Sequence, residues 1–207
     1  MTRAALLALL AGVTLSACAR DGLSLVETPP ETRWRAVTTD QDRDRLRDWR
    51  KAWVAALPAA RTADDGVIER EGALFEPDRA MANAMPPAGD YRCRTFKLGA
   101  RRADLRNFAM LPWARCRIGR DGDMPVFAVL EGDQRPSGTL YAESDARVIF
   151  LGALELGDET RALTYSQDRK RDMAGYIERV AIGRWRLVLP WPSFESQIDV
   201  IEMVPAG

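Results

Sequence analysis

The C-terminal stretch, residues 173–205, most constrains the fold, because it packs strand-forming residues densely between clear turn signals. β-Branched and aromatic residues fill three short segments. Gly183 separates the first segment from the second, and Pro190, Pro192 and Ser193 separate the second from the third. Three consecutive strands of this kind need further strands to cover their edges. The stretch therefore predicts the closing part of an antiparallel sheet.

Further strand-like segments precede this stretch at short, regular intervals. They lie at residues 89–99, 113–118, 124–131, 138–142, 147–156 and 161–165, with turn-rich pieces between them. Eight or nine short strands in this rhythm are typical of an up-and-down barrel or a sandwich. Residues 147–156 and 183–190 are apolar on both faces, which favours a barrel with a packed interior and a helix-covered exterior. We therefore predict a mainly β fold with an antiparallel up-and-down β-barrel over residues 89–205; the alternative is a β-sandwich with N-terminal helices.

A helical segment is expected ahead of the barrel, over residues 38–75. Thr38 and Thr39 offer capping oxygens just before a run of acidic residues, which favours a helix start. An apolar stripe follows at helical spacing, formed by Leu46, Trp49, Trp53 and Leu57. Pro58 is expected to end or kink this helix. A second, shorter helical pattern covers residues 64–75, and we expect the tryptophans to pack against the sheet.

The N-terminus predicts export and lipid attachment. Residues 1–17 show a short cationic start and an apolar run too short to span a membrane, as in a signal peptide. The run ends in L-S-A-C, which resembles the bacterial lipobox and predicts lipidation of Cys18. Residues 18–37, with Pro29 and Pro30, are interpreted as a flexible tether to a single domain at residues 38–207. Ala19 after the cysteine favours a position in the cell envelope on the outer membrane, facing the periplasm.

The composition narrows the classes of function. The chain has no histidine, which removes the usual general base of serine and cysteine hydrolases and the imidazole ligand of transition metals. Acidic and basic residues number 30 each, so no net field favours nucleic acid, and we expect no nucleic-acid partner. The carboxylates show no recognised cation-binding spacing. We therefore expect neither a metal nor a cofactor, and a non-catalytic role is favoured over an enzyme.

Two cysteines remain after lipidation of Cys18. Cys93 and Cys116 lie on two predicted strands joined by one connection, and an exported protein meets an oxidising compartment. A disulfide between these neighbouring strands is the natural interpretation. The alternative is a pair of reactive thiols, acidified by the arginines beside them.

Candidate ligand-binding residues fall in loops expected at the barrel ends. The polar stretch 156–175 contributes Tyr165, Asp168, Arg171 and Asp172. Two further loops contribute Gln134, Arg135, Trp191 and Glu195. The alternative interpretation of the polar stretch is a solvated loop whose charges compensate each other. A paired-carboxylate site is a further alternative, with Glu195 acting beside Asp172 or Asp199.

Several long motifs resemble one family. They are Y-R-C-R-T-x-K-L-G at 91–99, C-R-I at 116–118, Q-R-P-x-G-x-L-Y at 134–141, F-L-G-x-x-x-L-G-D-E at 150–159, R-D-M-A-G at 171–175 and R-W-R-L-V-L-P-W-P-x-F-E-S at 184–196. Together they resemble the domain of unknown function 4893 family of exported bacterial proteins, over residues 34–205. The family is uncharacterised, so the resemblance implies no activity and no catalytic residue. The expected architecture is also similar to that of the lipocalin and avidin group of calycins, with Tyr91 where the calycin opening carries a tryptophan.

Three functions follow as hypotheses. The first is a periplasm-facing lipoprotein whose barrel binds a small or lipidic ligand, or an envelope component, without chemistry. The second is an envelope assembly module that docks proteins through its tryptophan-bearing helix and loop ends. The third is a carboxylate-dependent hydrolase of envelope polysaccharide. A large apolar cavity inside the barrel would favour the first hypothesis, and a filled barrel with an exposed aromatic patch would favour the second.

Overall fold

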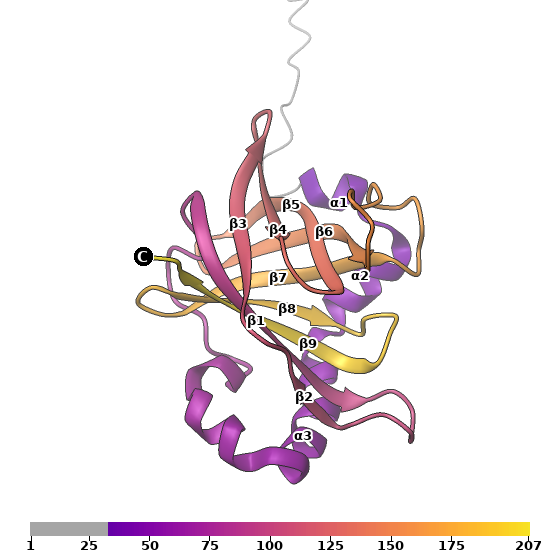
Figure 1. The fold of residues 1–207 in the computed structure, drawn as a ribbon. Coiled ribbons are helices and arrows are strands. Elements are labelled where there is room, and N and C mark those ends of the chain that lie inside the picture. The colour runs from indigo at the N-terminus through magenta and orange to yellow at the C-terminus, as the bar shows by residue number, and fades with distance from the viewer. Residues whose placement is uncertain (1–32) are drawn as a thin grey trace, which may run out of the picture.

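The computed structural model describes residues 33–207, which form an antiparallel β-barrel with helices packed on its outside (Figure 1). The strands are β1 (Gly89–Ala100), β2 (Phe108–Met110), β3 (Ala114–Asp121), β4 (Met124–Val129), β5 (Gln134–Ser144), β6 (Arg147–Leu156), β7 (Asp172–Ala181), β8 (Arg184–Pro190) and β9 (Ser196–Pro205). The helices are α1 (Arg33–Val37), α2 (Asp40–Arg47), α3 (Trp49–Glu71) and the 3₁₀ turn η2 (Gly72–Phe75). The predicted signal peptide, Cys18 and most of the predicted tether lie outside the described residues.

The strand order closes the sheet into a barrel. From β3 onward each strand pairs with its neighbour in sequence, and β9 returns to pair with β1 from Tyr91↔Pro205 to Ala100↔Ser196. β1 is long enough to pair with β3 through its first half and with the short β2 through its second half. Eight strands thus form the closed barrel and β2 is an addition at its rim. The prediction of an up-and-down barrel is confirmed over the sandwich.

Side chains fill the barrel interior. Alternation along β8 points Trp185, Leu187 and Leu189 inward. There they pack with buried side chains from all seven remaining strands of the barrel. The inner cluster also includes Phe127, Leu140, Phe150, Ile177, Ile201 and Met203, each at most 1 % exposed. Eight strands enclose a space just wide enough for side chains to fill, which accounts for the packed core.

The helices cover the outer face of β1 and β7–β9. α3 crosses this face, and its Trp53 is buried and donates a hydrogen bond through Nε1 to the Tyr176 hydroxyl, at 3.0 Å. Gly99 permits the close approach of α3 to β1. It has a φ of +67°, and a Cβ there would lie 2.8 Å from the Cα of Ala56. A side chain at Gly99 would therefore push the helix off the barrel.

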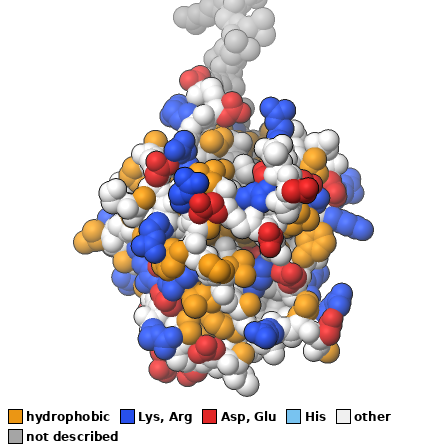
Figure 2. Space-filling view, in the orientation of Figure 1, with side chains coloured by type: hydrophobic (Ala, Val, Ile, Leu, Met, Phe, Trp, Pro, Cys, Tyr) orange, Lys and Arg blue, Asp and Glu red, His pale blue; other side chains and the backbone are white. Residues whose placement is uncertain are grey.

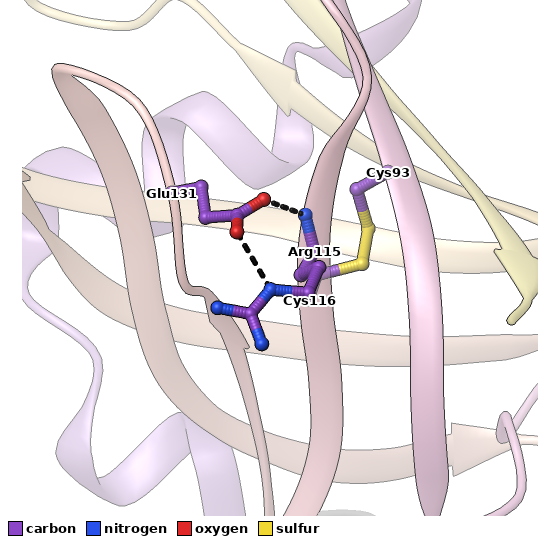
Figure 3. The surroundings of a disulfide bond; sticks show 4 residues. All are labelled: Cys93, Arg115, Cys116 and Glu131. Carbon is purple, nitrogen blue, oxygen red and sulfur yellow. Dashed lines mark hydrogen bonds and ion pairs between the residues drawn. A yellow bond between two sulfur atoms is a disulfide. The ribbon is translucent and has the colours of Figure 1, made fainter.

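The two remaining cysteines are joined by a disulfide. Cys93 of β1 and Cys116 of β3 face the barrel interior, with their Cα atoms 5.9 Å apart. Cys116 lies opposite Tyr91 in the register, so the disulfide crosses the strand pair diagonally. Beside it, the Glu131 carboxylate accepts hydrogen bonds from both the backbone N–H and the Nε of Arg115, as Figure 3 shows. The predicted disulfide is confirmed.

The structure corrects four local predictions. Residues 161–165 form no strand and belong to the loop between β6 and β7, whereas β2 was not predicted. Residues 33–37, placed in the tether, form α1 with Trp34 buried. Pro58 neither ends the helix nor marks its break, and the backbone hydrogen bond that its ring removes is the one to Val54, an exposed residue. The break falls at Asp64, whose carboxylate accepts from the Val67 N–H and starts the last turns of α3.

The surface carries mixed charge. Figure 2 shows one face of the domain, on which acidic and basic side chains intermingle with hydrophobic ones. Within residues 33–207, no helix has the length and hydropathy needed to cross a membrane.

Candidate binding site at the barrel end

Polar side chains replace the apolar core at one end of the barrel. At this end β1 and β6 finish and β5, β7 and β9 begin. Lys97 and Asp199 lie opposite each other in the β1–β9 register and share the face of the inward residues Cys93 and Met203. The interior therefore changes from apolar to ionic within a few residues along two paired strands.

A buried ammonium group holds this end together. Lys97 Nζ lies 3.0 Å from Glu195 Oε2 and 3.3 Å from Asp199 Oδ2. Burial lowers the pKa of Lys97, but the two carboxylates outweigh it and leave the pKa raised. Burial raises the pKa of Asp199 despite Lys97 and the Ser196 hydroxyl, which donates to it. Burial also acts to raise the pKa of Glu195, but the hydrogen bond from Lys97 leaves it lowered.

The loop between β8 and β9 covers this end in a strained conformation. Trp191 and Glu195 have positive φ angles of 51° and 62°, a region that non-glycine residues seldom adopt. Arg101 holds the loop by donating its backbone N–H to the Glu195 carbonyl, at 2.9 Å, and its guanidinium to the Pro192 carbonyl. Arg45 Nη2 donates to Ser193 Oγ at 3.0 Å. Strain maintained by several contacts is common at functional sites.

Two hollows meet beneath this loop. The inner one is a narrow, partly open chamber of about 20 Å³, enough for a single ordered water molecule. Its polar lining includes Thr95, Lys97, Asp172 and Asp199. The outer one is an open groove of about 490 Å³, lined by Arg101, Arg102, Leu105, Leu156 and Glu195. Gln134, Leu154, Ser193 and Phe194 line both hollows and therefore form the partition between them.

One carboxylate oxygen of a residue that borders the chamber lacks a partner. Asp172 is 3 % exposed, and its Oδ1 accepts a hydrogen bond from the Ser166 N–H at 2.8 Å. Its buried Oδ2 has no hydrogen-bond partner among the described residues. Burial is the main cause that raises the pKa of Asp172, and the nearby Asp42 adds to it. A buried polar atom of this kind costs stability unless an occupant of the chamber donates to it.

Four of the predicted ligand-binding residues meet at this end. Gln134 Nε2 lies 3.3 Å from Glu195 Oε2, and this contact spans the partition between β5 and the covering loop. Arg171 and Asp172 line the chamber from the start of β7. The Arg171 guanidinium donates to both carboxylate oxygens of Glu159, at 2.8 and 3.0 Å, and lowers the pKa of Glu159 to about 2. Arg171 is therefore held in place by Glu159.

The other four predicted residues make contacts within the protein and do not line either hollow. Arg135 donates to the Glu155 carboxylate and to the carbonyls of three loop residues, Gly132, Gly157 and Glu159. The Tyr165 hydroxyl donates to Asp42 at 2.7 Å and so ties its loop to α2. Trp191 Nε1 donates to the Asp48 carbonyl at 3.4 Å, and the Asp168 carboxylate accepts from the Lys170 N–H at 2.9 Å. These contacts shape the loops around the site.

The geometry gives no support to a paired-carboxylate site formed by Glu195 and Asp199. Glu195 and Asp199 both contact the Lys97 ammonium group, so a cation occupies the space between the carboxylates where a glycosidic bond would have to lie. Asp199 is also buried below the partition. Across residues 33–207, no three Cys, Asp or Glu side chains converge closely enough to hold a metal ion.

Lys97 is the central residue that the sequence did not reveal. A single lysine in a strand normally points to solvent, and only the β1–β9 register places this one inside the barrel. The signal that could have found it is the alternation of Cys93, Thr95 and Lys97 along one face of β1. Asp199 follows from the same register, two residues before the buried Ile201.

A closed and filled barrel, covered by helices on one side and polar at one end, defines this chain as a small β-barrel domain with a surface-accessible polar pocket. Residues 34–203 match the model of a family described as a domain of unknown function, DUF4893, and the chain belongs to that family. Comparisons with curated proteins and with solved structures found no match.

Proposed function

We propose that this chain is a lipid-anchored, non-catalytic binding protein of the bacterial cell envelope, and that the barrel end binds a small polar ligand. The observation that carries the proposal is a small polar chamber that adjoins an open groove and is bordered by Asp172, whose buried Oδ2 has no partner among the described residues. A ligand in the groove that extends a donor group into the chamber would satisfy this oxygen. The partition residues, Gln134 and Phe194, would move to admit it.

The packing of the barrel restricts the class of ligand. Because side chains fill the interior, an acyl chain has no space along the barrel axis, and the lipidic form of the ligand hypothesis loses its site inside the barrel. Asp172 accepts hydrogen bonds, whereas Leu105, Leu156 and Phe194 offer an apolar wall. A small molecule that carries hydroxyl or amine donors beside an apolar face fits this arrangement.

The experiment is a calorimetric titration of the full chain with a small panel, namely glucose, glucosamine and ethanolamine. We expect a member of the panel to bind, and Asp172→Asn to weaken its binding at least tenfold, because a carboxylate accepts stronger hydrogen bonds from donors than an amide does. Asp168→Asn is the matched control, since Asp168 lies in the same loop and does not line the chamber. Equal weakening by both variants, or no binding by the panel, would contradict the proposed site.

The proposed anchor is tested separately. Cys18→Ser removes the thiol that lipidation requires, so the variant should leave the membrane fraction or keep its signal peptide, and its mass should lack the lipid. A variant that fractionates with membranes and carries the same lipid mass as the wild type would exclude the anchor and, with it, the argument for the periplasmic face of the outer membrane.

A second candidate function is protein docking in envelope assembly. The observation that favours it is an open groove of about 670 Å³ beside the tryptophan-bearing helix, lined by the rings of Trp34, Trp49 and Tyr176.

A further inference from the structure

A second site lies on the side of the barrel, between the N-terminal helices and the outer face of β5–β7. We name it the lateral groove. Its volume is about 670 Å³, and its lining comprises Trp34, Arg35, Arg43, Leu46, Arg47, Trp49, Ala80, Glu143, Ser144, Ala146, Arg147, Ile149 and Tyr176. The lining is thus mainly apolar and aromatic, with four arginines and one carboxylate.

The floor of the lateral groove is aromatic and held in one position. The Trp49 and Tyr176 rings meet edge to face, with their centroids 5.5 Å apart. The Arg147 guanidinium lies over both rings, 4.7 Å from the Trp49 centroid and 4.4 Å from the Tyr176 centroid. Its Nε donates to the buried Glu178 at 3.1 Å, which fixes the guanidinium plane. A fixed guanidinium over aromatic rings presents charge and apolar surface together.

The rim of the lateral groove carries exposed positive charge. Arg43 and Arg47 are four residues apart on α2 and therefore lie on one face of that helix. Their side chains are 50 % and 68 % exposed, and each pairs with an exposed aspartate, Asp40 or Asp44. Exposed pairs of this kind contribute little free energy, so the guanidinium groups are able to exchange an aspartate for a ligand anion. Glu143, the one carboxylate of the lining, pairs with Arg35. The aspartates paired with Arg43 and Arg47 lie outside the lining, so these two exposed guanidinium groups favour an anionic occupant.

We propose that the lateral groove seats the headgroup of an anionic phospholipid from the membrane that carries the anchor. Guanidinium groups bind phosphate oxygens in a bidentate manner, and tryptophan and tyrosine rings favour the boundary between headgroups and acyl chains. The groove is also the part of the domain nearest the anchor along the chain. α1 begins at Arg33, fifteen positions after Cys18, a distance that an extended chain spans in at most about 50 Å.

The claim that the lipid belongs to the membrane that carries the anchor rests on the proposed lipid anchor. Binding of the headgroup in the lateral groove does not depend on that anchor. The experiment is therefore a titration of the full chain in a nonionic detergent with dihexanoyl phosphatidylglycerol. Dihexanoyl phosphatidylcholine is the reference, because it enters detergent micelles equally but is zwitterionic. We expect the anionic lipid to bind at least tenfold more tightly, and millimolar inorganic phosphate to compete weakly, since it lacks the apolar part.

Matched variants locate the site. Arg43→Gln combined with Arg47→Gln should weaken phosphatidylglycerol binding at least tenfold. Arg61→Gln on α3 is the control, because Arg61 is 51 % exposed and paired with Asp65 but lies outside the lateral groove. Equal affinity for both lipids, equal weakening by the control, or binding of an acidic peptide in place of the lipid would overturn the inference. Failure of the Cys18→Ser test would leave these affinities unchanged, so the two failures are distinguishable.

Discussion

Two buried cations hold the barrel of this protein, and their surroundings differ. Arg186 of β8 points outward beneath the segment that joins η2 to β1, whereas Lys97 of β1 points into the barrel end. Arg186 is 0 % exposed and Lys97 is 9 % exposed. Both therefore required carboxylate partners in order to be buried as charged groups.

The Arg186 network is complete. The guanidinium donates to Glu178 through Nε and Nη2, at 3.1 and 2.7 Å. Its remaining hydrogen-bonding directions reach the carbonyls of Leu74, Glu76 and Arg79, between 2.8 and 3.0 Å away. These bonds attach the connection after the helices to the outside of the barrel. All three guanidinium nitrogens are engaged by the protein itself, which identifies this network as structural.

The Lys97 network is incomplete at its border. Lys97, Asp199 and Glu195 satisfy one another, but the adjoining chamber is bordered by Asp172, whose Oδ2 is unpartnered among the described residues, and lies under a strained loop. Unsatisfied polar atoms and positive φ angles both cost free energy, and they coincide at this end of the barrel. The comparison indicates that the Arg186 network serves the fold, whereas the barrel end is where the proposed binding site lies.

Removing Arg186 is the change with the largest expected effect. Arg186→Met leaves Glu178 charged and buried and removes the donors to three carbonyls, so the free energy of unfolding should fall by about 3–5 kcal/mol. Urea denaturation measures the change. The exposed Arg120→Met is the control and should alter stability by less than about 0.5 kcal/mol. A loss below about 1 kcal/mol for Arg186→Met would show that this network is not structural.

Much of the Arg186 side of the molecule could be predicted from the sequence. The density of β-branched and aromatic residues in 183–190 predicts a strand, and the apolar stripe on α3 predicts a helix against the sheet. The carbonyl partners of Arg186 could not be predicted, because they lie in a segment without regular structure. β2 was missed for a related reason: its three residues have too little periodicity to indicate a strand.

The sequence predicts the loop residues of the barrel-end site but not the buried lysine at its centre. Gln134 and Glu195 sit among turn residues, which place them at strand ends, and the structure brings them into contact. The position of Lys97 inside the barrel depends on the pairing of β1 with β9, two strands distant in sequence, which local patterns do not encode. The loop from 161 to 165 was taken for a strand because Leu163 and Tyr165 alternate with polar residues, yet Tyr165 is held by Asp42 of a helix.

The disulfide links the other end of β1 to β3 covalently. The stability lost on its removal is therefore a reference for the losses expected from the Arg186 and Lys97 networks. Cys93→Ala should lower the free energy of unfolding by roughly 3 kcal/mol, because the linked loop restricts the unfolded chain. Urea denaturation with and without a reductant measures the effect, and the difference between wild type and variant should largely vanish in the reduced samples. A loss that persists unchanged under reduction would assign the effect to packing of the Cys93 side chain.

Replacing Lys97 tests the ionic contacts at the barrel end through the pH dependence of the free energy of unfolding. Lys97→Met leaves Asp199 and Glu195 close together without a cation, so unfolding should become easier by about 1–3 kcal/mol at pH 7. The pKa of Asp199, already raised by burial, should rise further. A carboxyl group with a raised folded-state pKa contributes stability at low pH that is lost as pH rises through that pKa.

The loss caused by Lys97→Met should therefore be greatest at neutral pH and should shrink as pH falls toward 4. In the wild type, the raised pKa of Lys97 acts at the alkaline end of the pH range. The stability that Lys97 contributes is complete below the ordinary lysine pKa of 10.5 and is lost as pH rises through the folded-state pKa. Denaturation curves at several pH values test both statements. A pH-independent loss would show that the variant acts through packing alone.

Gln134→Ala has the smallest expected effect on stability. It distinguishes most sharply between a residue that supports the fold and one that serves the proposed site at the barrel end. The Gln134 side chain is half-buried and its contact to Glu195 is long, at 3.3 Å, so the free energy of unfolding should change by less than about 0.5 kcal/mol. The contact nevertheless spans the partition between groove and chamber. Its removal should speed amide exchange several-fold in residues 191–196, where the Ser196 N–H donates to the Phe194 carbonyl, and leave β8 protected. Gln167→Ala, which removes a similar exposed contact to the Thr164 N–H, should leave residues 191–196 unchanged. Faster exchange throughout the barrel would mean instead that Gln134 supports the fold, and the barrel end would then resemble the Arg186 network.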